Sequence, residues 1–399
     1  MNILMLSLLY PQDQIDEVTR NAKDKLQNQI NNYQWAFVDG IRSNLNGDEK
    51  LDILNSLPVG IFPLQYRQLF LRKGTHDGTI CQLGGINLPW FKQTGRRIGA
   101  IREIERWVKM NPQNRTLLLY TQYLPYMEAV AHLKKRYHDL KAAVIVTDLP
   151  NDFGLASGRK GLMKKLEYLR GNKSMELCQK MDGFILLTDP MAEALKISHK
   201  PYTVIEGLIQ AKPEASEENI TCDNFTALYT GTLEPDLGIR ELLQAFSQRP
   251  QYELWICGHG SLQQEVQDIA AKHSNIKFYG FVPQKEALAL QAKASVLINP
   301  RSPEGVFTRY SFPSKTLEYL RSGKPVICYK LEGIPDDYDP YLCYITDTGS
   351  DGILKAVDNL ACKTEEERAS IGQAGREYVL YEKNQHVQCR KLIDLLRKL

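Results

Sequence analysis

Short apolar runs that alternate with helical patterns are the feature that most restricts the fold of this 399-residue chain. The runs are rich in Val, Ile, Leu and Tyr, as is typical of parallel strands buried on both faces of a sheet. They occur at residues 2–10, 115–123, 141–150 and 182–189 in the first half, and at 225–233, 252–260, 276–282, 294–300, 325–331 and 341–346 in the second. The pattern predicts an α/β protein with helices packed against its sheets.

A polar, turn-rich segment at 206–224 separates the two halves and is the candidate linker. We therefore expect two Rossmann-like, doubly wound domains at 1–205 and 206–382. Ligands of such sheets bind beyond the carboxyl ends of the strands, so the site is expected in a cleft between the domains. The last helix, 383–399, is expected to pack back against the N-terminal domain. In residues 40–115 the alternation of apolar runs and helical patterns is hardest to recognise.

Composition and charge argue against several classes of protein. A net charge of +3 is too small to indicate nucleic-acid binding. The eight cysteines form no CxxC or Cys/His cluster, which predicts free thiols in a reducing compartment and no structural zinc. The first apolar run has no basic residue before it and no run reaches the roughly 18 residues of a membrane span, so a first strand and a cytoplasmic protein are expected.

The stretch 298–327, INPRSPEGVFTRYSFPSKTLEYLRSGKPVI, carries the densest group of charged and aromatic residues. A helix is predicted at 314–322, and the start of a helix offers N–H groups and a partial positive charge to a phosphate. Glu318, one turn further on, would accept hydrogen bonds from sugar hydroxyls. Three cations and two carboxylates converge here: Arg301, Arg309, Lys315, Glu304 and Glu318. A solvated charged loop is the alternative, but the interspersed Phe307, Tyr310 and Phe312 favour burial and therefore a site.

Two further strand–loop–helix segments contain glycines where a ligand could approach the backbone. One strand ends at Gly231 and Thr232, and the other at Gly258, His259 and Gly260, with Ser261 as the expected N-cap of the next helix. No third glycine follows at the spacing of the dinucleotide fingerprint, which argues against a nicotinamide cofactor. Ordinary turns remain the alternative for both segments, and His259 is either a general base or a structural residue.

Together, 229–246, 254–266 and 298–327 resemble the C-terminal domain of retaining GT-B glycosyltransferases that use nucleotide sugars, and family 4 in particular. The likeness is closest to the bacterial group that assembles capsule, O-antigen and exopolysaccharide, in which YSFPSK…EY…SGKPV recurs. The N-terminal half is similar through SLLYP, VTDLP, LLTDPM and VIEG.

The resemblance implies a role for each matching position. Glu318 would bind the ribose hydroxyls, and the amides of Ser314, Lys315, Thr316 and Leu317 would hold the diphosphate. The segments 231–232 and 258–260 would lie near the phosphates and the nucleotide. The implied reaction moves a sugar, with retention, from a UDP- or GDP-sugar to a hydroxyl of a lipid-linked glycan acceptor. No DxD carboxylate pair stands out at a strand end, so we expect neither a metal nor another cofactor.

This chain departs from the family at two places. Tyr310 occupies the position of a second glutamate that reaches the donor sugar, and Glu304 is the nearby replacement candidate. Thr232 and Leu237 stand where relatives often carry an arginine and a lysine, which leaves the diphosphate charge to the cations of 301–315. In the N-terminal half, Asp148 is a candidate for contact with the sugar or the acceptor, or else a turn residue.

The segment 157–173 has six Lys or Arg residues against one Glu, interleaved with Leu and Met. It is either a surface for an anionic membrane, which would make the protein peripheral on the inner face of the cell membrane, or a solvated helix face. Two other functions stay open on the same architecture. One is an epimerase or hydrolase of the nucleotide sugar, and the other is a non-catalytic partner subunit of an active transferase.

Overall fold

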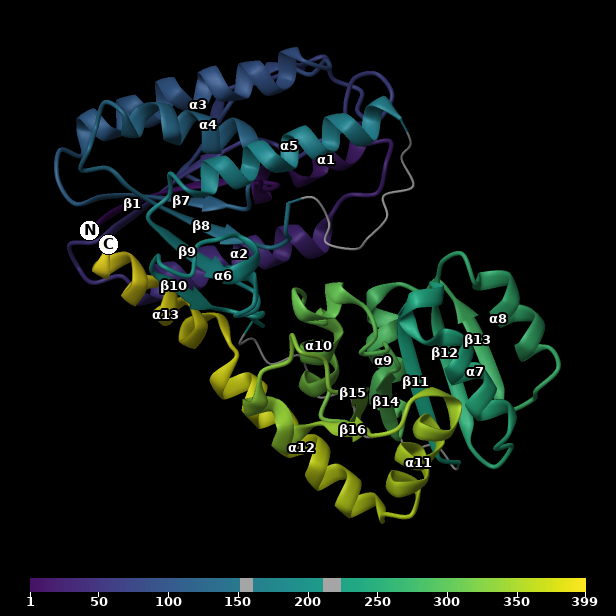
Figure 1. Cartoon of the computed structure of the whole chain (residues 1–399). Helices are drawn as coiled ribbons and strands as arrows, with labels where there is room; N and C mark the ends of the chain where they lie inside the picture. The colour runs from purple at the N-terminus through teal and green to yellow at the C-terminus, as the bar shows by residue number, and fades with distance from the viewer. Residues whose placement is uncertain (151–160, 211–223) are drawn as a thin grey trace. The chain divides into compact units, whose positions relative to one another are not determined.

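The computed structural model describes residues 1–150, 161–210 and 224–399, and the chain divides into two compact units. The first unit comprises Met1–Leu208 and Gln385–Leu399, and the second comprises Ile209–Asn384. Each unit has its own sheet, with helices packed against it (Figure 1). The predicted α/β class is therefore confirmed.

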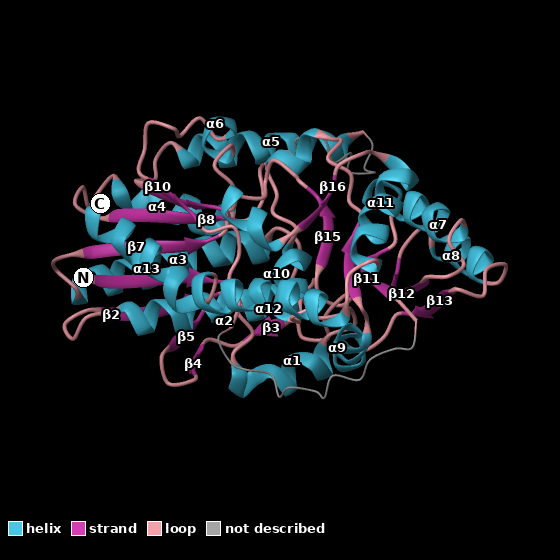
Figure 2. Cartoon of the chain, turned by 90° about the horizontal axis from the view of Figure 1, so that it is seen from below, coloured by secondary structure: helices cyan, strands magenta, loops and turns pink. Residues whose placement is uncertain are grey.

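The first unit is built on an eight-stranded sheet of order β10-β9-β8-β7-β1-β2-β5-β4. Its strands are β1 Asn2–Ser7, β2 Lys50–Asn55, β4 Gly74–His76, β5 Ile80–Gln82, β7 Arg115–Tyr120, β8 Lys141–Val146, β9 Gly183–Leu186 and β10 Tyr202–Val204. All neighbours are parallel except β4 and β5. Figure 2 shows β8, β7, β2 and β5 in this lateral order. The strand order reverses between β1 and β7, which is where an open α/β sheet offers a crevice.

Helices cover both faces of this sheet. Figure 1 shows α3 (Phe91–Met110), α4 (Leu124–Lys134) and α5 (Leu162–Cys178) on one face, with α2 (Asn28–Asn44) and α13 (Gln385–Lys398) on the other. Two short helices, α1 (Ile15–Asn21) and α6 (Met191–Ala194), lie in the connections. The α2 and α13 pair approaches closely, since a Cβ at Gly40 would lie 2.3 Å from the carbonyl oxygen of Gln385. The chain's last helix is thus part of the first unit's core.

The second unit has a six-stranded parallel sheet of order β13-β12-β11-β14-β15-β16. Its strands are β11 Thr226–Thr232, β12 Glu253–His259, β13 Ile276–Gly280, β14 Val296–Asn299, β15 Val326–Tyr329 and β16 Cys343–Ile345. Its helices are α7 Ile239–Ser247, α8 Gln263–Ala270, α9 Gln284–Lys293, α10 Ser314–Arg321, α11 Gly349–Ala361 and α12 Glu365–Glu382. Numbered along the chain, the strand order is 3-2-1-4-5-6, the doubly wound order that places a ligand between the first and fourth strands.

Every apolar run of the predicted set contains a strand, whereas residues 40–115 hold strands that the sequence did not reveal. Beside β2, β4 and β5, this region forms a separate two-stranded antiparallel sheet of β3 (Phe70–Leu71) and β6 (Gly85–Ile86). The candidate linker lies largely outside the described residues, which omit 211–223. Within the described ranges, no helix is both long enough and apolar enough to cross a membrane.

Candidate functional site

The candidate site lies at the carboxyl edge of the second sheet, where β11 is flanked by β12 and β14. The loops that follow β11 and β14 touch each other through their backbones. Gly238 has a φ of +72°, and a Cβ there would lie 2.1 Å from the carbonyl oxygen of Pro300. Because only glycine tolerates both the dihedral angle and this approach, Gly238 fixes the relative position of the two loops.

The loops after β11 and β12 are also packed together. The N–H of Leu233 donates to the carbonyl of His259 at 2.9 Å. A Cβ at Gly258 would lie 1.8 Å from the carbonyl oxygen of Gly231, and one at Gly260 would lie 2.3 Å from that of Leu233. The protein backbone itself therefore requires glycine at both positions, whatever ligand approaches the loop.

Ser261 does not cap α8, so this prediction is wrong. The cap position of α8 is Leu262, and no side chain caps the helix there. The N–H of Ser261 instead donates to the Glu234 carboxylate at 3.0 Å, and so does its hydroxyl. These hydrogen bonds lower the pKa of Glu234. The exposed ring of His259 packs edge-on against Phe281, with centroids 5.3 Å apart.

Glu318 sits on α10 and is two-thirds buried, with 33% of its side chain exposed. It accepts a hydrogen bond from Gln291 Nε2 at 2.8 Å and pairs with Lys315 Nζ at 3.0 Å. Gln291 comes from α9 and is buried, and sequence reasoning missed it because a glutamine in a helical run carries no motif. Glu318 is therefore held beside a cation and an amide, with a third of its side chain exposed.

A buried tyrosine ties α10 to β11. The hydroxyl of Tyr319 accepts a hydrogen bond from the Thr230 N–H at 2.8 Å and donates to the Thr230 carbonyl at 3.1 Å. Tyr319 is fully buried, and burial raises the pKa of its hydroxyl. Because Tyr319 directly follows Glu318 on α10, these hydrogen bonds also fix the position of Glu318 relative to β11, which carries Gly231 and Thr232.

The N-terminus of α10 begins at Ser314, after Pro313, and no side chain caps it. The N–H of Thr316 donates to the Pro313 carbonyl at 2.8 Å. Thr316 Oγ1 and Gln291 Oε1 are buried without a hydrogen-bond partner among the described residues. Unsatisfied buried oxygens are rare in proteins, so both oxygens stand out among the residues of α9 and α10. Leu317, the next residue, is buried in the core of the second unit.

The two arginines of the loop 300–313 differ in their burial and in their partners. Arg301 is half-buried and donates through Nη2 to Ser311 Oγ at 2.9 Å, and burial lowers the pKa of its guanidinium. Arg309 is more exposed and pairs with Glu332 at 3.3 Å. Glu304 is exposed on the same loop. Phe312 is buried and Tyr310 is half-buried, as their apolar character predicted, whereas the Phe307 side chain lies outside the described atoms.

In the first unit, Asp148 follows β8 and is exposed at the carboxyl edge of that sheet. Its charge and the burial of Tyr120 together raise the pKa of the Tyr120 hydroxyl, burial being the larger cause. The preceding Thr147 hydroxyl lies 3.1 Å from that of Thr121.

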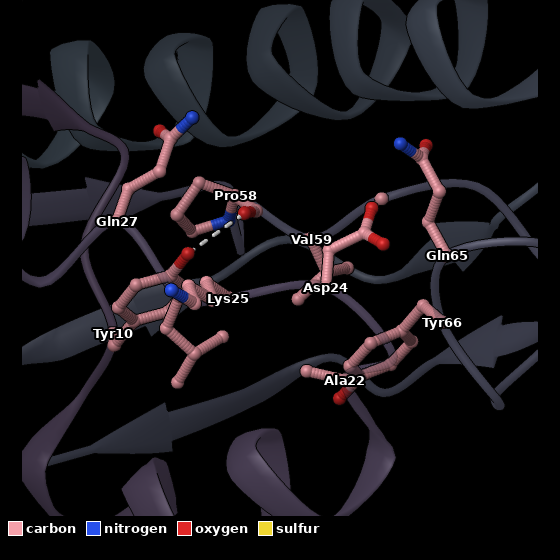
Figure 3. A pocket seen from close by; sticks show the side chains of 11 residues that line it. Tyr10, Ala22, Asp24, Lys25, Gln27, Pro58, Val59, Gln65 and Tyr66 are labelled. Carbon is pink, nitrogen blue, oxygen red and sulfur yellow. Dashed lines mark hydrogen bonds between the residues drawn. The ribbon is translucent and has the colours of Figure 1, made fainter. Parts of the chain in front are cut away.

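A pocket of about 260 Å³ lies at the ends of β1 and β2 in the same unit (Figure 3). Its wall includes Tyr10, whose hydroxyl donates to the Pro58 carbonyl at 3.1 Å. Asp24, Gln27 and Gln65 add exposed polar side chains, and Figure 3 draws the Asp24 carboxylate between Val59 and Gln65. The volume is below the roughly 300–1,000 Å³ of drug-sized sites, so the pocket suits a small polar ligand such as one sugar ring. Sequence reasoning missed it because its residues come from three separate segments, at 10, 22–27 and 58–66.

The basic segment 157–173 is described only from residue 161 onward. Helix α5 carries exposed Lys164, Lys165, Arg170 and Lys173 together with exposed Tyr168 and Leu169. Among the described residues, no three His, Cys, Asp or Glu side chains are grouped so that they could hold a metal ion.

Residues 212–378 match the family described as glycosyl transferases group 1. An O-antigen chain mannosyltransferase B from Escherichia coli is 30% identical over 119 residues, which are 28% of this chain and 30% of the relative. The alignment thus spans less than a third of that relative's length.

Solved structures resemble the chain over its whole length. The lipopolysaccharide outer core galactosyltransferase WaaB is 13% identical, with a TM-score of 0.59 and full coverage of both chains. A structure described as trehalose-6-phosphate from E. coli bound with UDP-2-fluoro glucose is 9% identical, with a TM-score of 0.62, and the match covers 100% of this chain and 99% of that one. The predicted GT-B fold and the predicted resemblance to GT-B glycosyltransferases are confirmed.

Proposed function

We propose that this chain, whose residues 212–378 are a glycosyl transferases group 1 domain within a GT-B fold, transfers a sugar from a nucleotide diphosphate sugar to a hydroxyl of a glycan. One observation carries the proposal. Glu318 is held by Gln291 and Lys315 one turn inside the uncapped N-terminus of α10, beside the point where the strand order reverses. A carboxylate behind a helix N-terminus matches a ribose joined to a pyrophosphate.

The pyrophosphate of the donor would lie against the N–H groups of residues 314–317, with Gly231 and Thr232 near it. Glu318 would accept hydrogen bonds from the ribose hydroxyls, and the loop 258–260 would contact the base. A UDP- or GDP-sugar fits this arrangement, and the structural relative bound with UDP-2-fluoro glucose favours a uridine donor.

Lys315 would change partners when the donor binds. Its pair with Glu318 is spaced i,i+3, and both side chains are 33% exposed, so the pair is worth only about 0.2–0.5 kcal/mol. The ribose would replace the ammonium group at Glu318, and Lys315 would turn towards the pyrophosphate. Arg301 and Arg309 from the preceding loop would add positive charge, and charge-assisted hydrogen bonds contribute roughly 1.5–3 kcal/mol each.

The reaction we propose breaks the bond between the anomeric carbon and the phosphate oxygen, and forms a bond from that carbon to the acceptor oxygen on the same face. The leaving phosphate oxygen would take the acceptor's proton, so neither a side-chain base nor a metal ion is needed. Stabilisation of the leaving diphosphate would then supply most of the rate enhancement. Glu304 would replace the carboxylate absent at Tyr310, and Asp148 would contact the sugar or the acceptor.

For the acceptor, we propose one sugar ring of a lipid-linked glycan in the pocket beside Tyr10, Asp24 and Gln65. The mannosyltransferase and galactosyltransferase relatives favour a polysaccharide of the cell surface. The exposed cations and apolar side chains of α5, within the segment 157–173, would contact the inner face of the cell membrane.

The test is a thermal-shift titration with UDP, GDP and their sugars, followed by an assay of donor consumption with and without a mannose-terminated acceptor. A donor at 100 times its Kd should stabilise the fold by about 2.7 kcal/mol. Turnover that depends on the acceptor is the expected result. Equal turnover without acceptor would favour the epimerase or hydrolase, and no shift with any nucleotide would favour the non-catalytic partner subunit.

A further inference from the structure

Five large apolar side chains are exposed around one small sheet of the first unit, and we call them the aromatic patch. Phe70 on β3 and Ile86 on β6 are directly paired across the sheet, and they are 65% and 39% exposed. Leu64, Trp90 and Phe91 complete the patch at 79%, 79% and 63% exposure. The backbone brings these segments together, since Phe62 N–H donates to the Asn87 carbonyl at 3.0 Å and Asn87 N–H donates to the Leu69 carbonyl at 2.7 Å.

Buried polar side chains hold the base of the aromatic patch in place. Asn87 Nδ2 donates to the carbonyls of Gly60 at 2.9 Å and Gln68 at 3.2 Å. From α3, Lys92 donates to the carbonyls of Val59 and Gly60, and Arg96 donates to the Leu57 carbonyl and to the Tyr123 hydroxyl. The loop 57–69 is thus fastened at several points, so the exposure of the aromatic patch is not the result of a loose loop.

Trp90 also has an unusual backbone conformation. It has a φ of +66°, which is unusual for a residue with a bulky side chain and indicates local strain. A strained backbone together with an exposed tryptophan is unfavourable for the isolated protein, and such features are retained where a partner uses them.

The surroundings of the aromatic patch are basic. Residues 61–98 contain six Lys or Arg residues and a single acid, Asp77. Two of the six, Lys92 and Arg96, are buried in the base described above, and Arg67, Arg72, Lys73 and Arg97 are exposed. Glu103 and Glu128 from α3 and α4 pair with Lys73 and Arg97, and Glu17 of α1 accepts a hydrogen bond from Gln68, the neighbour of Arg67. Arg72 therefore carries most of the uncompensated charge.

We propose that the aromatic patch inserts into the interfacial region of an anionic lipid bilayer. Aromatic side chains with neighbouring cations are the combination that binds this region, because the rings enter the headgroup layer and the cations bind lipid phosphates. The proposal is independent of the transfer reaction, and it concerns a surface distinct from α5.

Tryptophan fluorescence of the full chain tests the proposal directly. Of the four tryptophans, Trp107 and Trp255 are buried, Trp35 is half-buried, and Trp90 is 79% exposed. Vesicles of phosphatidylcholine with phosphatidylglycerol should shift the emission to shorter wavelength, and brominated lipids should quench it. Vesicles of phosphatidylcholine alone, or high salt, should reduce both effects. Unchanged emission with anionic vesicles would overturn the proposal.

Variants then locate the contact. Trp90→Asn with Phe91→Ser should lower partitioning onto the anionic vesicles at least tenfold, as measured by flotation. Met110→Ser, at the other end of α3 and 67% exposed, should bind as the wild type does. Circular dichroism spectra and urea unfolding midpoints equal to those of the wild type would report that the variants are folded.

Two further outcomes would refute the proposal. Loss of binding in Tyr168→Ser with Leu169→Ser, and not in the Trp90 variant, would assign the contact to α5 instead. A concentration-dependent dimer that the Trp90 variant abolishes, without vesicle binding by either protein, would mean that a second copy of the chain covers the aromatic patch.

Discussion

At the scale of single residues, the candidate site depends on side chains that the sequence predicted and on others that it could not predict. Glu318 stood out because it follows a helix start in a segment of strong family resemblance. Gln291 and Tyr319 did not, yet they hold Glu318 and its helix in place. A residue expected to bind a ligand can be identified from its sequence motif. The residues that hold it in position have no motif, and they are recognised only from their contacts in the structure.

Replacement of Glu318 should weaken donor binding without unfolding the protein. In Glu318→Ala, UDP affinity should fall roughly 10- to 100-fold, because charge-assisted hydrogen bonds to the ribose are worth about 1.5–3 kcal/mol. Calorimetric titration with UDP measures the change. Glu265→Ala on α8, which removes an exposed carboxylate paired with Arg240, is the matched control and should bind UDP normally. Unchanged affinity in Glu318→Ala would refute the ribose role.

Replacement of Lys315 should act mainly on turnover. In Lys315→Ala we expect kcat to fall roughly 100-fold, because the ammonium group would stabilise the charge that develops on the leaving diphosphate. The KM for the donor should change much less. Lys355→Ala removes a similar exposed ion pair, with Asp347, and should keep the wild-type kcat. A normal kcat in Lys315→Ala would remove this residue from the leaving-group assignment.

At the scale of elements, the apolar runs predicted every strand of the second sheet and β1, β7, β8 and β9 of the first. The strands β2, β4, β5 and β10 of the first sheet escaped, and so did the two strands of the small sheet. A pattern of period two or 3.6 needs several residues to become visible, and β3 and β6 have two residues each. Their region is held together by Asn87, Lys92 and Arg96, which donate to loop carbonyls far away in the sequence. A lysine or arginine in a helical run reads as a surface residue, so sequence alone could not predict that these two are buried.

The pH dependence of stability should report the buried Lys92. Burial, followed by the nearby Arg96 charge, lowers the pKa of Lys92 to about 7 from an ordinary value near 10.5. The unfolded chain therefore binds more protons than the folded chain between about pH 7 and 10.5, so the contribution of Lys92 to the free energy of unfolding rises with pH in this window.

Lys92→Met removes this titration, so the difference in unfolding free energy between wild type and variant should shift in favour of the wild type from pH 7 to 10. Urea unfolding at several pH values measures it. Lys109→Met, an exposed position on the same helix, should keep the wild-type pH dependence. Parallel curves for the wild type and Lys92→Met would mean that Lys92 titrates in the folded state as it does in the unfolded chain.

At the scale of the whole molecule, the chain enters the second unit once and returns to the first. The units meet along the sequence at 208–209 and again at 384–385. Near these points the chain segments pair, since Ile209 N–H donates to the Lys383 carbonyl at 3.0 Å and Ile209 bridges to Asn384. Beyond them, α13 buries one face against α2, with Asn44 Nδ2 donating to the His386 carbonyl at 2.8 Å. The terminal fifteen residues therefore stabilise the unit in which the chain began.

This division predicts that a cavity in α13 destabilises the first unit alone. Leu392 is fully buried in the core of that unit, and Leu392→Ala should lower its free energy of unfolding by about 2–5 kcal/mol. Hydrogen exchange should accelerate in β1 and β7, while exchange in β11 and β14 and the affinity for UDP stay unchanged. Leu243→Ala, equally buried in the second unit, is the matched variant and should accelerate exchange in β11 and β14 instead. If Leu392→Ala accelerated exchange in β11 and β14, the last helix would be coupled to the donor-binding unit, and the assignment of α13 to the first unit's cooperative core would be wrong.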